Sequence, residues 1–132
     1  MKYMLDTNIC IYIIKKKPIR VLQTLKKKDI GEVCISSITL AELEYGVEKS
    51  KYKLKNQLAL VEFLAPIEIL GFEDSAAKQF GKIRAKLESK GIVIGPFDLQ
   101  IAAHAISENL ILVTNNLKEF SRVSKLKFEN WL

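Results

Sequence analysis

Three carboxylates and one amide occur where an apolar segment of this sequence ends or where a helix is expected to begin. They are Asp6, Glu42, Asp98 and Asn116. In an open α/β sheet these are the positions where a ligand crevice forms. Oxygen ligands without histidine or cysteine suit a hard cation such as Mg²⁺ or Mn²⁺. The pattern therefore indicates a metal site and phosphate chemistry.

Each acid also has an ordinary structural explanation. Asp6 could be only the N-cap of the helix that follows it, and the dipole of its own helix could stabilise Asp98. Glu42 ends the capping-box pattern Thr39-Leu40-Ala41-Glu42, although Ser36 or Ser37 already starts that helix. Their coincidence favours a site, because carboxylates gathered at one sheet edge repel one another unless a cation joins them. Such a cation can activate water and stabilise charge on a phosphoryl oxygen.

Strands and helices alternate along the chain, which predicts the α/β class with a central parallel sheet flanked by helices. Strands are expected at 3–5, 32–36, 67–70, 110–113 and 126–128, and helices at 8–15, 18–27, 37–49, 53–65, 73–90 and 97–109. The helix at 53–65 is predicted from Leu54, Leu58, Val61 and Ala65, which recur at helical spacing. A length of 132 residues predicts one domain spanning 1–132.

The composition favours a nucleic-acid partner. The formal charge is +6, and lysines cluster at 15–17, at 26–28 and at alternate positions from 49 to 55, although such runs are also common on solvated faces. No apolar run approaches the roughly 18–20 residues that cross a bilayer, and the first residues lead directly into a strand without room for a signal peptide. We therefore expect a cytoplasmic protein without a membrane partner.

The remaining chemically reactive residues are expected to be structural. Cys10 and Cys34 lie within apolar segments and are predicted to be buried thiols rather than a disulfide or a zinc site. His104 is the single histidine, which excludes a two-histidine acid–base route to RNA cleavage. It is six positions after Asp98 on a different helical face, so a packed structural histidine is predicted.

Several segments resemble the PIN-domain ribonucleases and, among them, the VapC toxins of bacterial toxin–antitoxin pairs. The similar segments are 4–8, 35–46, 83–85, 94–102 and 113–120, and the resemblance extends over essentially the whole chain. It implies a PIN-like three-layer fold in which Asp6, Glu42 and Asp98 are metal-binding carboxylates. It also implies that Thr7, Asn8 and Thr114 support them.

Many members of that family carry a fourth acid at the position that Asn116 occupies here. An amide oxygen can bind a cation but brings no charge, so Asn116 is expected to be a fourth catalytic residue that contributes less than the three acids. Glu119, three residues further on, is the alternative source of the fourth acid.

The resulting expectation is a Mg²⁺- or Mn²⁺-dependent endoribonuclease that acts as the toxin of its pair. The resemblance implies transfer RNA as the substrate class and a VapB-type antitoxin lying across a groove, which the adjacent amphipathic helices 37–49 and 53–65 could line. It also implies homodimers and a larger complex that binds operator DNA through the antitoxin. Two alternatives stay open: a non-catalytic domain that binds nucleic acid or a partner, and a DNA nuclease of related fold.

Overall fold

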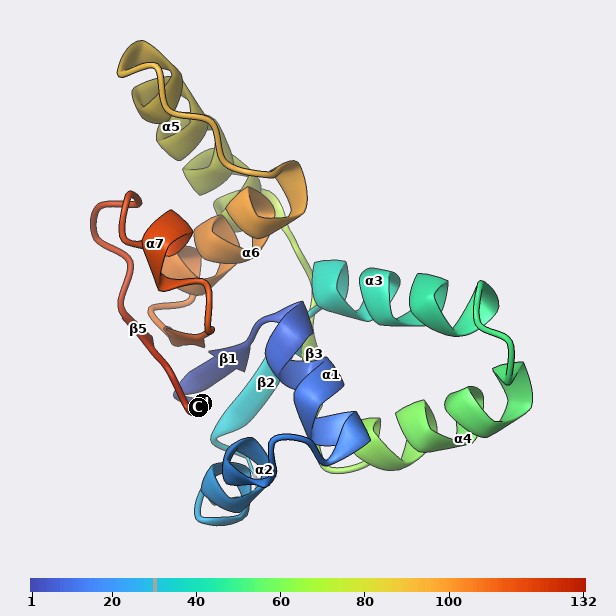
Figure 1. The fold of residues 1–132 in the computed structure, drawn as a ribbon. Coiled ribbons are helices and arrows are strands. Elements are labelled where there is room, and N and C mark those ends of the chain that lie inside the picture. Colours follow the sequence, from blue (N-terminus) through green and yellow to red (C-terminus); the bar gives the residue numbers. More distant parts are fainter. Residues whose placement is uncertain (30) are drawn as a thin grey trace.

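The computed structural model describes residues 1–29 and 31–132. Its centre is a five-stranded parallel sheet with helices around it (Figure 1). The strands are β1 (Tyr3–Leu5), β2 (Val33–Ser36), β3 (Glu68–Leu70), β4 (Ile111–Val113) and β5 (Phe128–Glu129). Their spatial order is β3-β2-β1-β4-β5, and all four pairings are parallel. The chain order reverses between β1 and β4, so the carboxyl ends of these two strands form the switch point where a ligand crevice is expected.

Seven helices lie within the described part of the chain. They are α1 (Thr7–Lys15), α2 (Ile19–Lys26), α3 (Ser37–Glu48), α4 (Lys53–Leu64), α5 (Asp74–Ser89), α6 (Pro96–Ser107) and α7 (Leu117–Phe120). The first six confirm the sequence-based prediction to within about two residues at each end, which is the usual uncertainty of helix boundaries. The short helix α7 was not predicted. None of the described helices is both long and apolar enough to span a membrane.

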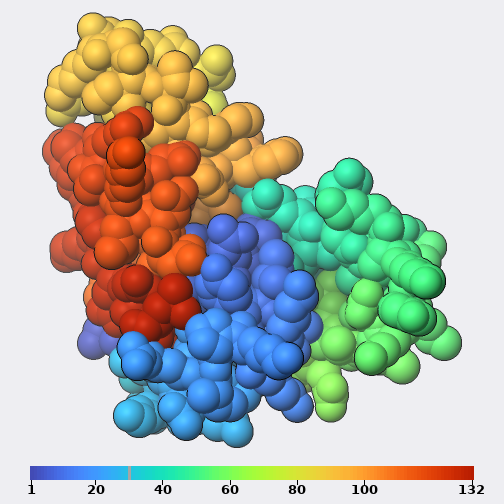
Figure 2. All heavy atoms as spheres, viewed as in Figure 1, coloured from blue at the N-terminus to red at the C-terminus, as the bar shows by residue number. Residues whose placement is uncertain are grey.

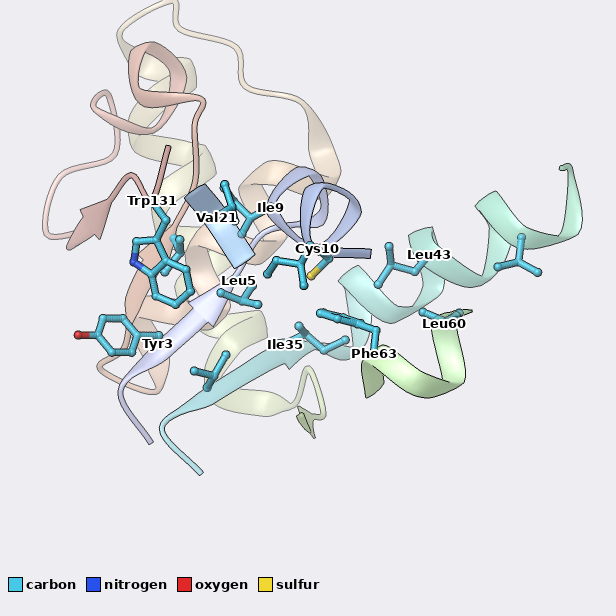
Figure 3. Packing of buried hydrophobic residues seen from close by; sticks show 14 residues of the cluster. Tyr3, Leu5, Ile9, Cys10, Val21, Ile35, Leu43, Leu60, Phe63 and Trp131 are labelled. Atoms are coloured by element: carbon cyan, nitrogen blue, oxygen red, sulfur yellow. The ribbon is translucent and has the colours of Figure 1, made fainter. Parts of the chain in front are cut away.

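The helices cover both faces of the sheet because successive residues of a buried strand point to opposite sides. Tyr3 and Leu5 of β1 pack in one cluster with α1 to α4 and with Trp131, as Figure 3 shows. Met4, between them, packs in a second cluster with α5, α6 and α7. The predicted three layers, helices–sheet–helices, are confirmed.

Helix α4 forms where it was predicted, but the apolar residues that predict it do not face the core. Leu54, Leu58 and Val61 are 76%, 61% and 56% exposed, whereas Leu60 and Phe63 on another side of the helix are buried. Two apolar stripes run along this helix, and only one of them can pack against α1 and α3. Figure 1 shows α3 and α4 as an arm that projects from the sheet, which leaves the outer stripe uncovered.

The cysteines and the histidine are structural, as predicted. Cys10 and Cys34 are buried, form no disulfide and lie in different core clusters. His104 is 1% exposed; its Nδ1 lies 2.7 Å from Ser36 Oγ, and its ring meets that of Phe72 edge-on. Burial lowers the pKa of His104, so the ring is neutral near pH 7.

Candidate active site

Four segments meet at the carboxyl edge of β1 and β4 (Figure 1). Three of them, the starts of α1 and α3 and the turn before α7, directly follow strands of the parallel sheet. The fourth is the start of α6, where Pro96 occupies the first helical position because it needs no backbone N–H donor there. The topology thus brings four helix entrances, and the acids that they carry, to one place.

We refer to the carboxyl edge of β1 and β4, with the carboxylates of Asp6, Glu42, Asp98 and Glu119, as the acidic edge. Asp6 belongs to it and is also the N-cap of α1. Its Oδ1 accepts a hydrogen bond from the Ile9 amide at 2.9 Å, and the side chain is 3% exposed. Burial raises the pKa of Asp6, and the nearby Glu42 raises it further, while hydrogen bonds from Thr114 and Ile9 partly offset this. A simple surface cap would have its pKa lowered by these hydrogen bonds. The capping explanation is therefore correct but incomplete.

Glu42 is held by α1 rather than by the start of its own helix. Thr7 Oγ1 donates a hydrogen bond to Glu42 Oε1 at 2.6 Å, and Thr39 Oγ1 is 3.5 Å from the same hydroxyl. The N-cap of α3 is Ser36, whose Oγ accepts from the Ile38 amide at 3.1 Å. The capping-box explanation of Glu42 is therefore wrong, because the carboxylate faces the end of β1 instead of the helix start.

Asp98 and Glu119 are neighbouring carboxyl groups at this edge, and Glu119 contributes to the raised pKa of Asp98. Burial raises the pKa of Asp98 to about 7, with further contributions from Glu119, Asp6 and Glu42. The helix dipole would have the opposite effect, so it does not dominate at this position. All four acids therefore interact electrostatically.

Glu119 is placed at the site by hydrogen bonds to both of its oxygens. The Gly95 amide donates to Oε1 at 3.2 Å and Asn116 Nδ2 donates to Oε2 at 3.1 Å. The Asn116 amide in turn donates to Thr114 Oγ1 at 2.9 Å. Asn116 thus orients the Glu119 carboxylate, a role that its sequence position did not reveal.

The remaining predicted residues lie at the same edge with different surroundings. Thr114 is fully buried at the end of β4, close to Asp6. Asn8 is in the first turn of α1 with its side chain exposed. Sequence reasoning missed a contact between the strand end and α1, in which Asn115 Nδ2 donates to the hydroxyl of Tyr12 at 2.9 Å. The one sequence signal for this contact is that Asn115 comes two residues after the end of β4.

The donor set of this edge fits a hard divalent cation. It consists of carboxylate, amide and hydroxyl oxygens, which Mg²⁺ and Mn²⁺ prefer. In residues 1–29 and 31–132, no three acidic, histidine or cysteine side chains are grouped tightly enough to hold an ion as they stand. Partly desolvated like charges can be relieved by a proton or by a cation. The raised pKa values of Asp6 and Asp98 are in the direction that added positive charge would reverse.

Comparison with known proteins assigns the family. The PIN domain matches residues 3–126. The chain belongs to the PIN-domain family. Within it, the chain is 50% identical to Ribonuclease VapC2 of Haemophilus influenzae over 132 residues, which covers all of this chain and 99% of that protein. It is 47% identical to the tRNA(fMet)-specific endonuclease VapC of Shigella flexneri, covering 99% and 98% of the two chains. It is thus a VapC-type PIN protein.

Solved structures agree with this assignment. The DNA-bound VapBC of Salmonella typhimurium superposes with a TM-score of 0.95 at 44% identity, covering 100% of this chain and 99% of that chain. VapBC2 of Rickettsia felis, bound to a DNA fragment from its promoter, superposes with a TM-score of 0.92 at 50% identity, with both chains fully covered. The predicted PIN-like fold is thereby confirmed.

Proposed function

We propose that this VapC-type ribonuclease is the toxin of a toxin–antitoxin pair and hydrolyses RNA phosphodiester bonds with a bound Mg²⁺ or Mn²⁺. One observation carries the metal-dependent mechanism: Asp6, Glu42, Asp98 and Glu119 converge at the switch point of the sheet and interact there. The relatives named as ribonucleases, at 50% identity over the full chain, support the activity.

Asp6, Glu42 and Asp98 would hold the cation, and we assign the fourth carboxylate to Glu119. Asn116 contributes by holding Glu119 through its side-chain amide. When bound, the cation activates water for attack on phosphorus and stabilises charge on a phosphoryl oxygen. Without a cation, the negative charge of the acidic edge would repel the substrate phosphate. Binding of the cation therefore favours binding of the substrate.

The protein holds its acids in place before any substrate arrives. A backbone amide fixes Asp6, the Thr7 hydroxyl fixes Glu42, and Asn116 fixes Glu119. Each acid is also carried by a regular element or by the turn that directly follows a strand. Oxygens that are already oriented need little reorganisation during the reaction, which lowers the entropic part of the barrier.

We propose transfer RNA as the substrate class. The VapC proteins of Shigella flexneri and Salmonella typhimurium, each 47% identical to this chain, are named tRNA(fMet)-specific endonucleases. The excess of positive charge suits a polyanionic substrate. A transfer RNA mixture incubated with the protein should therefore give discrete fragments, and end-sequencing would identify the RNA and the cut position.

We propose a VapB-type antitoxin as the partner, seated in a groove between α1, α3 and α4. This groove has a volume of about 310 Å³, apolar walls that include Ile11, Leu43 and Leu60, and Glu42 in its lining. An amphipathic helix could bury its apolar side there and cover the acidic edge. We further propose a homodimer and a toxin–antitoxin complex that binds operator DNA through the antitoxin, as the promoter-bound VapBC2 of Rickettsia felis suggests.

Cleavage assays with matched RNA and DNA hairpins test the catalytic proposal against its two alternatives. Cleavage of RNA with Mg²⁺ or Mn²⁺, and none with EDTA, is the expected result. DNA cleavage alone would identify a DNA nuclease, and no cleavage with saturating Mn²⁺ would favour a non-catalytic binding domain.

The matched control variants lie on one helix. Glu42→Gln should abolish cleavage, whereas Glu44→Gln should leave it unchanged, because Glu44 is exposed and points about 200° away around α3. Equal loss in both variants would refute the site assignment.

A further inference from the structure

A small pocket lies between α5 and the chain that follows α7, away from the arm formed by α3 and α4. Its volume is about 110 Å³. Five basic residues line it: Lys82, Lys86, Lys90, Arg122 and Lys125. None of the lining residues in the described chain is acidic. We refer to these five residues and the space between them as the basic pocket.

Two segments that are distant in sequence build the basic pocket. Lys82, Lys86 and Lys90 repeat every four residues along α5 and its C-terminal end, so they share one face. The chain after α7 brings Arg122 and Lys125 against that face, and Lys86 Nζ donates to Ser124 Oγ at 3.3 Å. Figure 2 shows the yellow atoms of α5 directly against the orange-red atoms of this later segment.

In the part of the chain that the structure describes, no ion pair neutralises the charges of the basic pocket. The ion pairs of residues 1–29 and 31–132 are Lys53–Glu48 and Arg84–Glu88, and neither involves a basic-pocket residue. Like charges at a spacing of four on a helix destabilise it. An anion bound between them would remove this repulsion, so the pocket favours a negatively charged ligand.

The basic pocket is linked to the acidic edge through α6 and through the end of α7. The Arg122 amide donates to the Glu119 carbonyl at 3.2 Å, so the pocket begins one turn beyond an acid of the site. Ile106 in the pocket wall is eight residues after Asp98 on α6, or about 12 Å along the helix axis. At about 3.4 Å per nucleotide along one strand, this separation along α6 corresponds to roughly four nucleotides.

We propose that the basic pocket binds a backbone phosphate of the RNA substrate and aligns the strand with the acidic edge; this rests on the proposed ribonuclease function. The acidic edge cannot attract RNA by itself, so nearby cations must hold the strand. A volume of about 110 Å³ is that of three or four water molecules, enough for one phosphate group. Lysine side chains act there as point charges that do not read the base sequence.

The lysine clusters that the sequence suggested for this role are less suitable. Lys28 lies over the rings of Tyr3 and Trp131, and Lys53 is paired with Glu48. The clusters at 15–17 and 26–28 follow the far end of α1 and the end of α2, whereas the basic pocket gathers five cations around one cavity.

RNA binding tests the proposal without depending on turnover. In an Asp98→Asn background, the variant Lys82→Gln/Lys86→Gln/Arg122→Gln is compared with the control Lys17→Gln/Lys26→Gln/Lys27→Gln, which loses the same charge elsewhere. Fluorescence anisotropy of a labelled transfer RNA transcript gives Kd over a range of salt concentrations. We expect the pocket variant to bind at least about tenfold more weakly and its log–log salt slope to fall by about 1, because the one lost phosphate contact removes about 0.7 to 0.9.

Turnover gives the second readout. With Asp98 restored, the pocket variant should show a KM raised about tenfold and a kcat within about twofold of the parent. The arginine variant Lys82→Arg/Lys86→Arg should keep normal binding, since it retains the charges. Unchanged affinity and salt slope in the pocket variant, or an equal loss in the control, would overturn the proposal.

The remaining outcomes separate this proposal from others. Normal RNA binding combined with loss of binding to an acidic peptide would overturn it and assign the pocket to a protein partner. If the parent protein cleaved no RNA but the pocket variant still lost RNA affinity selectively, the basic pocket would stand and the proposed catalytic function would fail.

Discussion

Replacing Asp98 with asparagine should stabilise the cation-free protein at alkaline pH while abolishing RNA cleavage. Burial and the neighbouring acids raise the pKa of Asp98 from 3.8 to about 7, so its ionised form is disfavoured in the folded state. An asparagine at this position carries no charge, and its side-chain amide can donate a hydrogen bond to a neighbouring carboxylate.

The sign and size of this effect follow from proton linkage. A carboxyl group with a higher pKa in the folded state stabilises the protein fully below about pH 4, and this stabilisation is lost as the pH rises through about 7. The difference of roughly three pKa units corresponds to about 4 kcal/mol at most. Because Asp98 is only partly buried and its titration depends on that of its neighbour Glu119, we expect about 2 kcal/mol.

Thermal unfolding followed by circular dichroism in EDTA measures this difference. At pH 8 the Asp98→Asn variant should melt about 8 °C above the parent, the shift that about 2 kcal/mol gives in a chain of this size. At pH 5 the gap should be less than half as large, since the parent carboxyl group is then largely protonated. Glu44→Gln, an exposed acid on α3, is the control. A lower melting temperature for Asp98→Asn at pH 8, or an equal gain in the control, would refute the reasoning.

Calorimetric titration with Mn²⁺ should show a larger loss of affinity for Glu119→Gln than for Asn116→Ala, and the reverse order would return the fourth-ligand role to Asn116. Asn116→Asp should strengthen Mn²⁺ binding by on the order of 1 kcal/mol, because it adds a negative charge to the site, and weaker Mn²⁺ binding would contradict this. The same substitution should lower the melting temperature in EDTA, because it places a carboxylate where an amide donates to Glu119. Thr7→Val removes the hydroxyl that Glu42 accepts from, so kcat should fall about tenfold or more, as loss of a hydrogen bond to a charged group implies; an unchanged kcat would show that Glu42 needs no such support. Cleaved RNA should carry 5′-phosphate and 3′-hydroxyl ends, since water attacks the phosphorus, whereas 2′,3′-cyclic phosphate ends would indicate attack by the substrate's own 2′-hydroxyl.

The sequence alone determined the features that depend on neighbouring residues. Apolar spacing and boundary signals such as Pro96 predicted six of the helices in the described chain, because a helix is stabilised by contacts three and four residues apart. The alternation of strands and helices predicted the parallel sheet, and with it the meeting of Asp6 with the segment after β4. Both follow from rules that operate within one element or between consecutive elements.

Only the tertiary structure decided how the acidic edge is completed. Glu119 lies on α7, a helix of four residues that is too short to produce a periodic pattern. Its position depends on donors from Gly95 and Asn116, and its effect on the pKa of Asp98 depends on distance in space. Desolvation and charge interactions are set by three-dimensional proximity, which residue spacing in the chain does not report.

Three-dimensional proximity also decides which surface residues are covered and which of them lie together. Leu54 and Leu60 are both apolar residues of α4, yet only Leu60 is buried, because burial requires a partner surface and α1 and α3 reach only one side of that helix. Lys82 and Arg122 are 40 residues apart in the sequence and line one pocket in space. Local patterns specify what each helix can present, and the packing of the helices decides which of those faces meet a core, a partner or a substrate.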